Sequence, residues 1–380
     1  MATIVHVMLC SRFHLGMGYQ ENLLTSKQRE LGHDVSVITY RENADDEILS
    51  TSDGVTIYQL PRSIFSYIPF VSKCFDRAVG LYKMLETLLP DIIFVHQTYA
   101  ADYLKINKYK NAHREVVVYA DNHDDYYNSP VKSIKDIVYR KVICRNMSRK
   151  FSRVCTKIWG VTPWRVDYLA DVYGVPREKI DLLVMGGDDK LVVKAQEDDS
   201  RRRVRKDLDI PETAFVLITG GKIDEGKNID KVLEAVDLMG DELYLIVFGK
   251  FSEAMMDKCM KYMNKPSVKN IGWISPDDVY KYFTASDMGV FPGTHSVLWE
   301  QACASGLPCI FKDWDGGFNH VDCGGNCIML YGDVTTHAIM DAINKIISDK
   351  NLFLAMRKVA QEVAKPIFSY SVIARRSVGM

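Results

Sequence analysis

Paired cysteines are missing from this sequence. Its nine cysteines are scattered and no CxxC pair occurs; the closest group is Cys323 and Cys327. Disulfide frameworks and cysteine metal sites need tighter, paired spacing. We therefore expect buried or incidental free thiols, and a reducing compartment.

Long apolar runs and an excess of charge of either sign are also missing. The formal net charge is −1, with 47% hydrophobic and 26% charged residues, which is typical of a soluble globular protein. The chain as a whole is therefore no polyanion binder, and any basic function must come from a local patch. No apolar run approaches the roughly 18 residues of a membrane span, and no basic segment precedes the first run, TIVHVMLC, as in a signal peptide. We expect a cytoplasmic protein.

What the sequence has instead is a regular alternation of strand-length apolar runs with longer helical patterns. Residues 91–97 and 115–122 are continuous apolar runs, typical of parallel strands buried on both faces. The alternation lapses in the charge-rich residues 195–212 and restarts with FVLITGG, and 380 residues are too many for one compact core. We predict an α/β protein of two doubly wound, Rossmann-like domains, whose ligands bind beyond the carboxyl ends of the strands.

The octapeptide GKIDEGKN, residues 221–228, differs by one letter from the phosphate-binding P-loop pattern. Asn228 stands where that pattern requires a Ser or Thr hydroxyl to hold magnesium. Asp224 and Glu225 lie inside the loop and would repel a triphosphate. These departures disfavour a nucleoside-triphosphatase, which remains an alternative.

Two lysines in the same octapeptide offer another way to hold phosphate. Lys222 and Lys227 flank a turn between a buried strand and the helical stretch NIDKVLEAVDLM. This arrangement aims both ammonium groups and the helix N-terminus at one point above the sheet. Two such cations neutralise a diphosphate without a metal ion. Two solvated surface lysines are the alternative.

Glu300 lies in an otherwise apolar helical run, VLWEQACA, that begins at a strand exit. A carboxylate near the start of a helix can accept two hydrogen bonds from a vicinal diol such as that of a ribose. A capping or surface carboxylate is the alternative. The sequence has no carboxylate cluster at metal-site spacing, so we expect no essential divalent ion and no cofactor.

Taken in order, these stretches resemble the retaining glycosyltransferases of family 4, which have the two-domain GT-B fold. GGKIDEGKNIDKVLEA resembles the family's phosphate loop, VKNIGWISPDDVYKYFTASDMGVFPG the segment that passes the base, and HSVLWEQACASGLPCI the helix with the second glutamate of its E-x7-E motif. The first half is similar in a glycine loop after the first strand, in ELGHDVSVIT and LLPDIIFVHQ, and in a strand ending at Asn122, His123 and Asp124. The likeness covers nearly the whole chain.

The resemblance implies a role for each matching residue. Lys222 and Lys227 would hold the diphosphate of a nucleotide-sugar donor and stabilise the charge that builds on it as it leaves. Glu300 would bind the ribose hydroxyls, and His123 would lie near the transferred sugar, although a strand-end histidine can also be structural. The other implied donor-binding residues are Gly16, Gly18, Gly221, Trp273, Ile274, His295, Ser296 and Val297.

The sequence departs from the family pattern at two positions. Lys222 replaces the usual arginine, which keeps the charge but loses the bidentate fork. Pro292 stands where the first glutamate of E-x7-E belongs. That glutamate touches the donor sugar in the family, so the sugar and the details of its transfer stay open.

The resemblance also implies a domain division and an activity. We expect residues 1–190 to form the acceptor-side domain, with a C-terminal helix at 366–380 packing back on it, and residues 191–365 to form the nucleotide-sugar domain. The implied activity is that of a retaining hexosyltransferase in polysaccharide biosynthesis, with a UDP-sugar donor and a glycan or lipid-linked acceptor. A sugar-nucleotide epimerase of the same architecture and an inactive nucleotide-binding scaffold remain alternatives.

Residues 130–158 are strongly basic. Nine lysines and arginines, Lys132, Lys135, Arg140, Lys141, Arg145, Arg149, Lys150, Arg153 and Lys157, face a single acid, Asp136, and apolar residues recur at helical spacing. Such a helix can lie on an anionic membrane surface, as bacterial surface-polysaccharide transferases of this family do. A packed helix with one solvated face is the alternative, and we expect no nucleic-acid binding.

Overall fold

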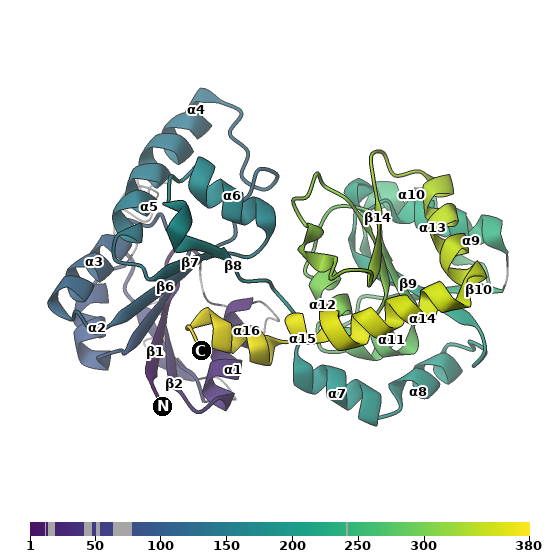
Figure 1. The fold of residues 1–380 in the computed structure, drawn as a ribbon, viewed down its shortest axis with the longest axis horizontal. Helices are drawn as coiled ribbons and strands as arrows, with labels where there is room; N and C mark the ends of the chain where they lie inside the picture. Colours follow the sequence, from purple (N-terminus) through teal and green to yellow (C-terminus); the bar gives the residue numbers. More distant parts are fainter. Residues whose placement is uncertain (12, 14–19, 42–47, 51–53, 64–77, 241) are drawn as a thin grey trace. The chain divides into compact units, whose positions relative to one another are not determined.

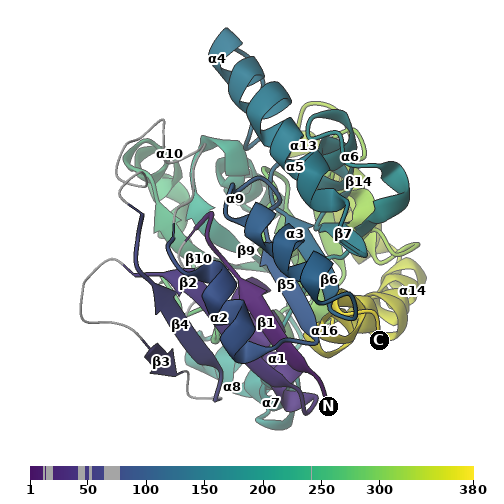
Figure 2. The ribbon, with the colours of Figure 1, turned by 90° about the vertical axis from the view of Figure 1, so that its left-hand side faces the viewer.

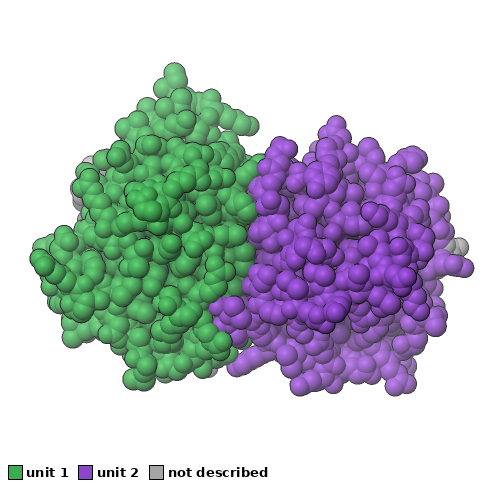
Figure 3. Space-filling view, viewed as in Figure 1, with its two compact units in different colours: residues 1–184, 373–380 green, residues 185–372 purple. Residues whose placement is uncertain are grey.

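The computed structural model describes residues 1–11, 13, 20–41, 48–50, 54–63, 78–240 and 242–380, which form two compact units. Unit 1 comprises Met1–Val184 and Ile373–Met380, and unit 2 comprises Met185–Val372 (Figure 1, Figure 3). Each unit is a parallel sheet with helices packed on it, so the predicted fold class is confirmed.

The units divide after Val184 rather than after residue 190, and residues 366–372 belong to unit 2. Within unit 2, Gly187 N–H donates to Phe368 O at 2.9 Å. This bond joins the segment that enters unit 2 to the segment that leaves it.

The sheet of unit 1 has the strand order β3-β4-β2-β1-β5-β6-β7-β8. Its strands are β1 Thr3–Val7, β2 Asp34–Tyr40, β3 Ile48–Ser50, β4 Thr56–Leu60, β5 Ile92–His96, β6 Val117–Asn122, β7 Lys157–Gly160 and β8 Ile180–Leu182. Neighbouring strands are parallel except at the edge, where β3 runs antiparallel to β4. All five residues of β5, IIFVH, are buried, as expected for a parallel strand with both faces covered.

Helices of unit 1 begin at recognisable signals. They are α1 Gln20–Glu30, α2 Leu81–Leu88, α3 Tyr103–Ala112, α4 Ile134–Asp136, the π-helical η3 Ile137–Cys144, α5 Arg145–Ser152, α6 Pro163–Asp171, the 3-10 turn η4 Arg177–Lys179, and α16 Tyr370–Ser377, which belongs to unit 1 from Ile373 onward. The α4 helix starts at a capping box of Ser133 and Asp136. The α6 helix starts at Pro163, whose missing N–H costs nothing in the first turn.

The sheet of unit 2 is fully parallel, in the order β11-β10-β9-β12-β13-β14. Its strands are β9 Phe215–Ile223, β10 Leu243–Phe251, β11 Val268–Gly272, β12 Met288–Phe291, β13 Cys309–Lys312 and β14 Cys327–Leu330. Its helices are α7 Asp189–Glu197, α8 Ser200–Asp207, α9 Ile229–Met239, α10 Glu253–Met263, α11 Val279–Ala285, α12 Leu298–Ala304, α13 Thr336–Ser348, α14 Lys350–Val359 and α15 Lys365–Ile367, with short η5 Glu225–Lys227, η6 Asn319–Val321 and η7 Ala360–Ala364.

The charge-rich residues 195–212, expected to interrupt the pattern, fold into the end of α7 and the whole of α8. Arg205 of α8 is fully buried and donates to Asp287 Oδ2 at 2.8 Å. Asp287 also accepts from Arg201 at 2.8 Å and from Val216 N–H at 2.9 Å. These charges therefore pack α8 onto the body of unit 2 and do not form a linker.

Throughout the described residues, no helix combines the length and the apolar character that crossing a membrane requires.

Candidate functional site

The sheet of unit 2 reverses its winding direction between β9 and β12. The predicted phosphate loop follows β9, and the stretch leading to the glutamate helix follows β12, so both leave the same edge of the sheet. Thr294 N–H donates to Gly226 O at 2.8 Å, which joins the two loops. Open α/β sheets bind ligands at such a switch point.

The two loops touch through their backbones, and glycine makes this contact possible. A Cβ on Gly293 would lie 2.4 Å from Gly226 O. On the neighbouring strand β10, a Cβ on Gly249 would lie 1.9 Å from Gly221 O, and Gly249 has a φ of 120°. No larger residue fits these positions without moving the backbone.

Asn228 ends the phosphate loop in the left-handed region, with φ 54° and ψ 29°. Asparagine tolerates this conformation, whereas a β-branched threonine is strained in it. The Asn228 amide donates to Pro292 O at 2.9 Å, and its Oδ1 accepts from Lys231 at 3.0 Å. The residue that departs from the P-loop pattern therefore ties the loop to the end of β12.

Lys227 directs its ammonium group into the contact between the loops. Its Nζ donates to Thr294 O at 2.6 Å and to His295 O at 3.4 Å. Burial lowers the pKa of Lys227, and the nearby Asp224 opposes this shift. An ammonium has three N–H donors, so one of them has no partner among the described residues.

A small pocket lies beside Lys227. It is lined by Thr219, Gly220, Lys227, Ile229, Phe291, Gly293, Thr294, Ser296 and Trp299. The Thr219 hydroxyl is buried and has no hydrogen-bond partner in the described part of the chain. A cation, an unpaired hydroxyl and glycine backbone together suit an anionic oxygen. Sequence reasoning found Lys227 and missed Thr219, which looks like any other strand residue.

Lys222 lies outside this pocket, with an exposed side chain near the end of β9. Its partner across the sheet is Lys250 of β10, which is also exposed. Like charges side by side on neighbouring strands repel each other unless an anion lies between them. The structure thus places Lys222 beside a second cation that the octapeptide did not contain.

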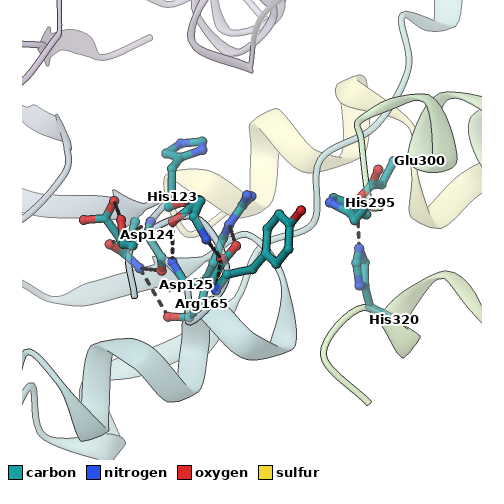
Figure 4. Close-up of polar contacts among 11 residues, drawn as sticks. His123, Asp124, Asp125, Arg165, His295, Glu300 and His320 are labelled. Carbon is teal, nitrogen blue, oxygen red and sulfur yellow. Dashed lines mark hydrogen bonds and ion pairs between the residues drawn. The ribbon is translucent and has the colours of Figure 1, made fainter. Parts of the chain in front are cut away.

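Glu300 is fully buried near the start of α12 and lies against two histidines (Figure 4). His295 Nε2 lies 2.7 Å and His320 Nε2 2.9 Å from the same oxygen, Glu300 Oε1. Burial alone would raise the pKa of Glu300, but the two histidines outweigh it and hold this pKa well below its usual range. Glu300 is therefore ionised, and its other oxygen, Oε2, has no partner among the described residues.

The histidines that hold Glu300 come from two different loops. The ring of His295 stacks on Phe318 with centroids 4.3 Å apart, so it points away from the open surface. His320 is contributed by η6, and sequence reasoning missed it because nothing in the intervening chain predicts the contact. Glu300 is thus neither a capping nor a surface carboxylate.

The remaining predicted residues lie around the same edge or outside the described chain. Trp273 follows β11 and is 71% exposed, with Ile274 half-buried beside it. Ser296 lines the pocket, and Val297 precedes α12. Gly16 and Gly18 lie outside the described residues.

His123 follows β6 at the carboxyl edge of the unit 1 sheet. Its Nε2 lies 3.4 Å from Asp121 Oδ2, and its side chain is 31% exposed. The loop beyond it is held in place, because Asn128 donates to His123 O at 2.7 Å and Arg165 donates to the buried Asp125 at 3.1 Å (Figure 4). This fixed loop presents one accessible histidine.

In the part of the chain that the structure describes, two triads have ligand-type atoms within 4.8 Å of one another: His96, Asp121 and His123 in unit 1, and His295, Glu300 and His320 in unit 2. Both ring nitrogens of His96 are engaged in hydrogen bonds. A metal-bound histidine donates its second N–H to a further acceptor, but His320 Nδ1 has no partner among the described residues. We therefore treat both triads as hydrogen-bonded groups.

Two family models match the chain in succession. Residues 22–189 match the model described as Glycosyltransferase Family 4, and residues 200–363 match the model described as Glycosyl transferases group 1. Unit 1 thus carries a domain of family 4 type and unit 2 a group 1 domain. The resemblance to glycosyltransferases is confirmed at this level.

Solved structures similar to this chain extend over nearly all of it. Anabaena HepE in complex with UDP and glucose is 15% identical, with a TM-score of 0.67, over 99% of this chain and 98% of that one. WaaG, a glycosyltransferase involved in lipopolysaccharide biosynthesis, is 16% identical, with a TM-score of 0.63, over 99% of this chain and 100% of that one. A putative UDP-N-acetylglucosamine 2-epimerase from Listeria monocytogenes is 12% identical, with a TM-score of 0.61, over 99% and 94%. At these identities the likeness shows the fold, which is GT-B. No curated protein sequence matches the chain.

Proposed function

Since both units carry glycosyltransferase domains, we propose that this protein is a retaining hexosyltransferase that moves a sugar from a UDP-sugar to a glycan or lipid-linked acceptor. The pocket beside Lys227 carries the proposal. It lies at the switch point of the unit 2 sheet, and it combines a half-buried lysine, whose ammonium has a spare N–H, with the unpaired hydroxyl of Thr219.

The chemistry of transfer explains why these groups lie at this point. Breaking the anomeric C–O bond builds negative charge on the departing diphosphate. A preorganised cation stabilises that charge most in the transition state, where catalysis must act. Lys227 supplies one such cation inside the pocket, and the exposed pair Lys222 and Lys250 supplies positive charge at the adjoining strand ends.

Glu300 would bind the ribose of the donor. Its Oε2 is a buried carboxylate oxygen without a partner among the described residues, and leaving a buried acceptor unpaired costs about 1–3 kcal/mol. A ribose hydroxyl donated to Oε2 removes that cost. Because Glu300 is fully buried, this contact requires the side chains around it to rearrange.

Nucleotide-dependent melting tests the donor side. We choose UDP because Anabaena HepE has been solved with UDP and with UDP-glucose. UDP at 100 times its dissociation constant should stabilise the protein by about 2.7 kcal/mol, without any metal ion, and more than GDP or ADP at equal concentration. A shift with magnesium-ATP alone would contradict the proposal and restore the triphosphatase alternative.

Two rivals differ from a transferase in their products. An epimerase converts the sugar nucleotide without an acceptor, whereas an inactive scaffold binds UDP and never releases it from a UDP-sugar. The scaffold draws its support from Pro292, which occupies the place of the family's first glutamate. Release of UDP from UDP-glucose, followed by analysis of the sugar product, separates the three.

We also propose that unit 1 docks on an anionic membrane through the start of its basic segment. Four apolar residues are exposed there: Ile134 at 79%, Val142 at 57%, and Ile137 and Val138 at 45% each. Lys132, Lys135 and Lys141 are exposed among them. Figure 2 shows α4 at the free end of the helix that runs through η3 into α5. An apolar surface flanked by lysines is what an interfacial helix presents to lipid.

The second half of the basic segment differs from the first. Phe151 and Ile158 are buried, and Arg145 donates to the carbonyls of Asp171 and Val172 at 2.9 and 3.0 Å. The apolar residues of 130–158 therefore do not form one continuous face. Only the residues of α4 and η3 are suited to lipid.

Substitution of the exposed lysines tests the docking surface. Replacing Lys132, Lys135 and Lys141 with glutamine should weaken binding to phosphatidylglycerol vesicles about a hundredfold, since each charge near such a surface contributes about 1 kcal/mol. Binding is measured by vesicle sedimentation. Lys194, Lys206 and Lys350 of unit 2, replaced in the same way, serve as the matched control. Equal binding by both triple variants would remove the docking role.

A further inference from the structure

A row of buried titratable side chains crosses the sheet of unit 1, and none of its members has a role in the reaction proposed above. His6 lies on β1, His96 on the neighbouring strand β5, and Asp121 on the next strand, β6. All three residues are buried. Asp121 lies directly opposite His96 in the strand register, and its carboxylate is also the partner of His123.

The donor and acceptor of each hydrogen bond in this row can be assigned by starting from Ser377, next to Gln28. The Ser377 hydroxyl has one hydrogen and donates it to Ala374 O at 2.7 Å. It must therefore accept the bond from Gln28 Nε2, at 3.0 Å. The orientation of the Gln28 amide then places its oxygen, Oε1, 2.7 Å from His6 Nε2. His6 Nε2 consequently carries a hydrogen.

His6 is neutral, because burial and the neighbouring His96 lower the pKa of His6 to about 3. With its one hydrogen on Nε2, His6 has an acceptor at Nδ1. His96 Nε2 lies 3.0 Å from this acceptor and must donate to it. His96 Nε2 therefore carries a hydrogen as well.

The other nitrogen of His96 faces a carboxylate. His96 Nδ1 lies 2.9 Å from Asp121 Oδ2. Burial alone would raise the pKa of Asp121, but His96 and His123 hold this pKa well below its usual range, so the carboxylate accepts. With donors on both nitrogens, His96 is an imidazolium. Burial opposes this charge, yet Asp121 raises the pKa of His96 overall.

Asp121 also determines which nitrogen of His123 carries the hydrogen. His123 Nε2 faces Asp121 Oδ2 at 3.4 Å, so Nε2 is the donor and Nδ1 keeps its lone pair. His123 Nδ1 is then the acceptor that the ring offers to a substrate.

We propose that His96 and Asp121 are positioning residues for the transfer: their buried ion pair orients His123, with its hydrogen on Nε2, so that Nδ1 accepts a hydroxyl of the transferred sugar. This inference rests on the proposed function through the place of His123 near that sugar. Among the described residues, the titratable or charged groups acting on His96 are His6 of β1, Asp121 of β6 and Glu21 of α1. His123 faces Asp121.

Nitrogen-15 NMR of the whole protein with labelled histidines tests the pair without any activity assay. At pH 8 one histidine should show both ring nitrogens protonated, and its signals should vanish in His96→Gln. A second should carry a single hydrogen on Nε2 and vanish in His123→Gln. A neutral His96 at pH 8, or a hydrogen on Nδ1 of His123, would overturn the proposal.

Kinetics test the positioning role. In His96→Gln, kcat for UDP release from UDP-glucose should fall with little change in KM, because Asp121 loses the partner that holds it in place. In Asp121→Asn, kcat should fall about a hundredfold with little change in KM, as for a misplaced catalytic contact. His113→Gln is the matched control, since it removes another histidine–carboxylate pair, 3.2 Å from Glu86.

The outcomes separate this inference from the proposed function. A normal kcat in both His96→Gln and Asp121→Asn would overturn the positioning role while the transferase stands. No UDP release by the unsubstituted protein, with the expected NMR pattern, would overturn the proposed function and the role of His123 in it, and would leave the ion pair established.

Discussion

Lys227→Ala is expected to lower kcat for UDP release from UDP-glucose about 100- to 1000-fold, the cost of removing one preorganised donor from a developing oxyanion. The ammonium lies in the pocket at the switch point, and one of its three N–H groups is without a partner among the described residues. The substitution leaves the pocket without its cation. The measurement is steady-state release of UDP, with melting in UDP to follow donor binding.

Lys231→Ala is the matched control for Lys227→Ala. Lys231 lies four residues further on and makes a similar pair of bonds, to Asn228 Oδ1 at 3.0 Å and to Val334 O at 2.8 Å, but it does not line the pocket. Both variants should lose comparable stability, and only Lys227→Ala should lose turnover. Turnover within tenfold of the unsubstituted protein in Lys227→Ala would remove the diphosphate role from this residue.

Asp287→Ala should cost unit 2 about 3–5 kcal/mol of its free energy of unfolding, because it leaves a buried guanidinium without its counter-ion. Arg205 is fully buried, and the Asp287 carboxylate bonds to it, to Arg201 and to Val216 N–H. A loss of this size is a large part of the 5–15 kcal/mol that stabilises a typical domain. Urea unfolding, followed on the transition of unit 2, measures it.

An exposed ion-pair network provides the comparison for Asp287→Ala. Arg177 is 61% exposed and bonds to Asp167 and Asp171 at 2.7 and 3.2 Å. Arg177→Ala should cost at most about 1 kcal/mol, because such pairs are screened by solvent. Equal losses in the two variants would mean that the burial of Arg205 contributes nothing of its own.

Most of the fold was predictable because buried parallel strands are continuous apolar runs. The runs at 91–97 and 115–122 became β5 and β6, and FVLITGG became the greater part of β9. The strands β3, β4, β7, β8 and β14 were not predicted. The charged stretch 195–212 was misinterpreted because sequence alone does not show that Arg205 meets Asp287, which lies 82 residues further along the chain.

The candidate site was predictable only as far as local spacing reaches. Lys227 and Glu300 stand out because each is a charge within a recognisable strand–turn–helix stretch. Their partners do not. His320 reaches Glu300 from a separate loop, and Lys250 meets Lys222 only through the register of two strands. Polar groups that converge from distant segments need the three-dimensional structure to be found.

The left-handed backbone conformation of Asn228 shows why similarity between short motifs is weak evidence of a common structure. In sequence, GKIDEGKN differs from a nucleoside-triphosphatase loop at one position, so a motif search that allows one mismatch would group the two. The backbone conformation at the mismatched position is distinctive, because Asn228 has a φ of 54°. Its side-chain amide also binds the loop to Pro292 O. A threonine at this position would be strained by the left-handed backbone conformation and would lack the amide that donates to Pro292 O. Two loops of nearly identical sequence can therefore differ in conformation, and the backbone torsion angles of a single residue distinguish them.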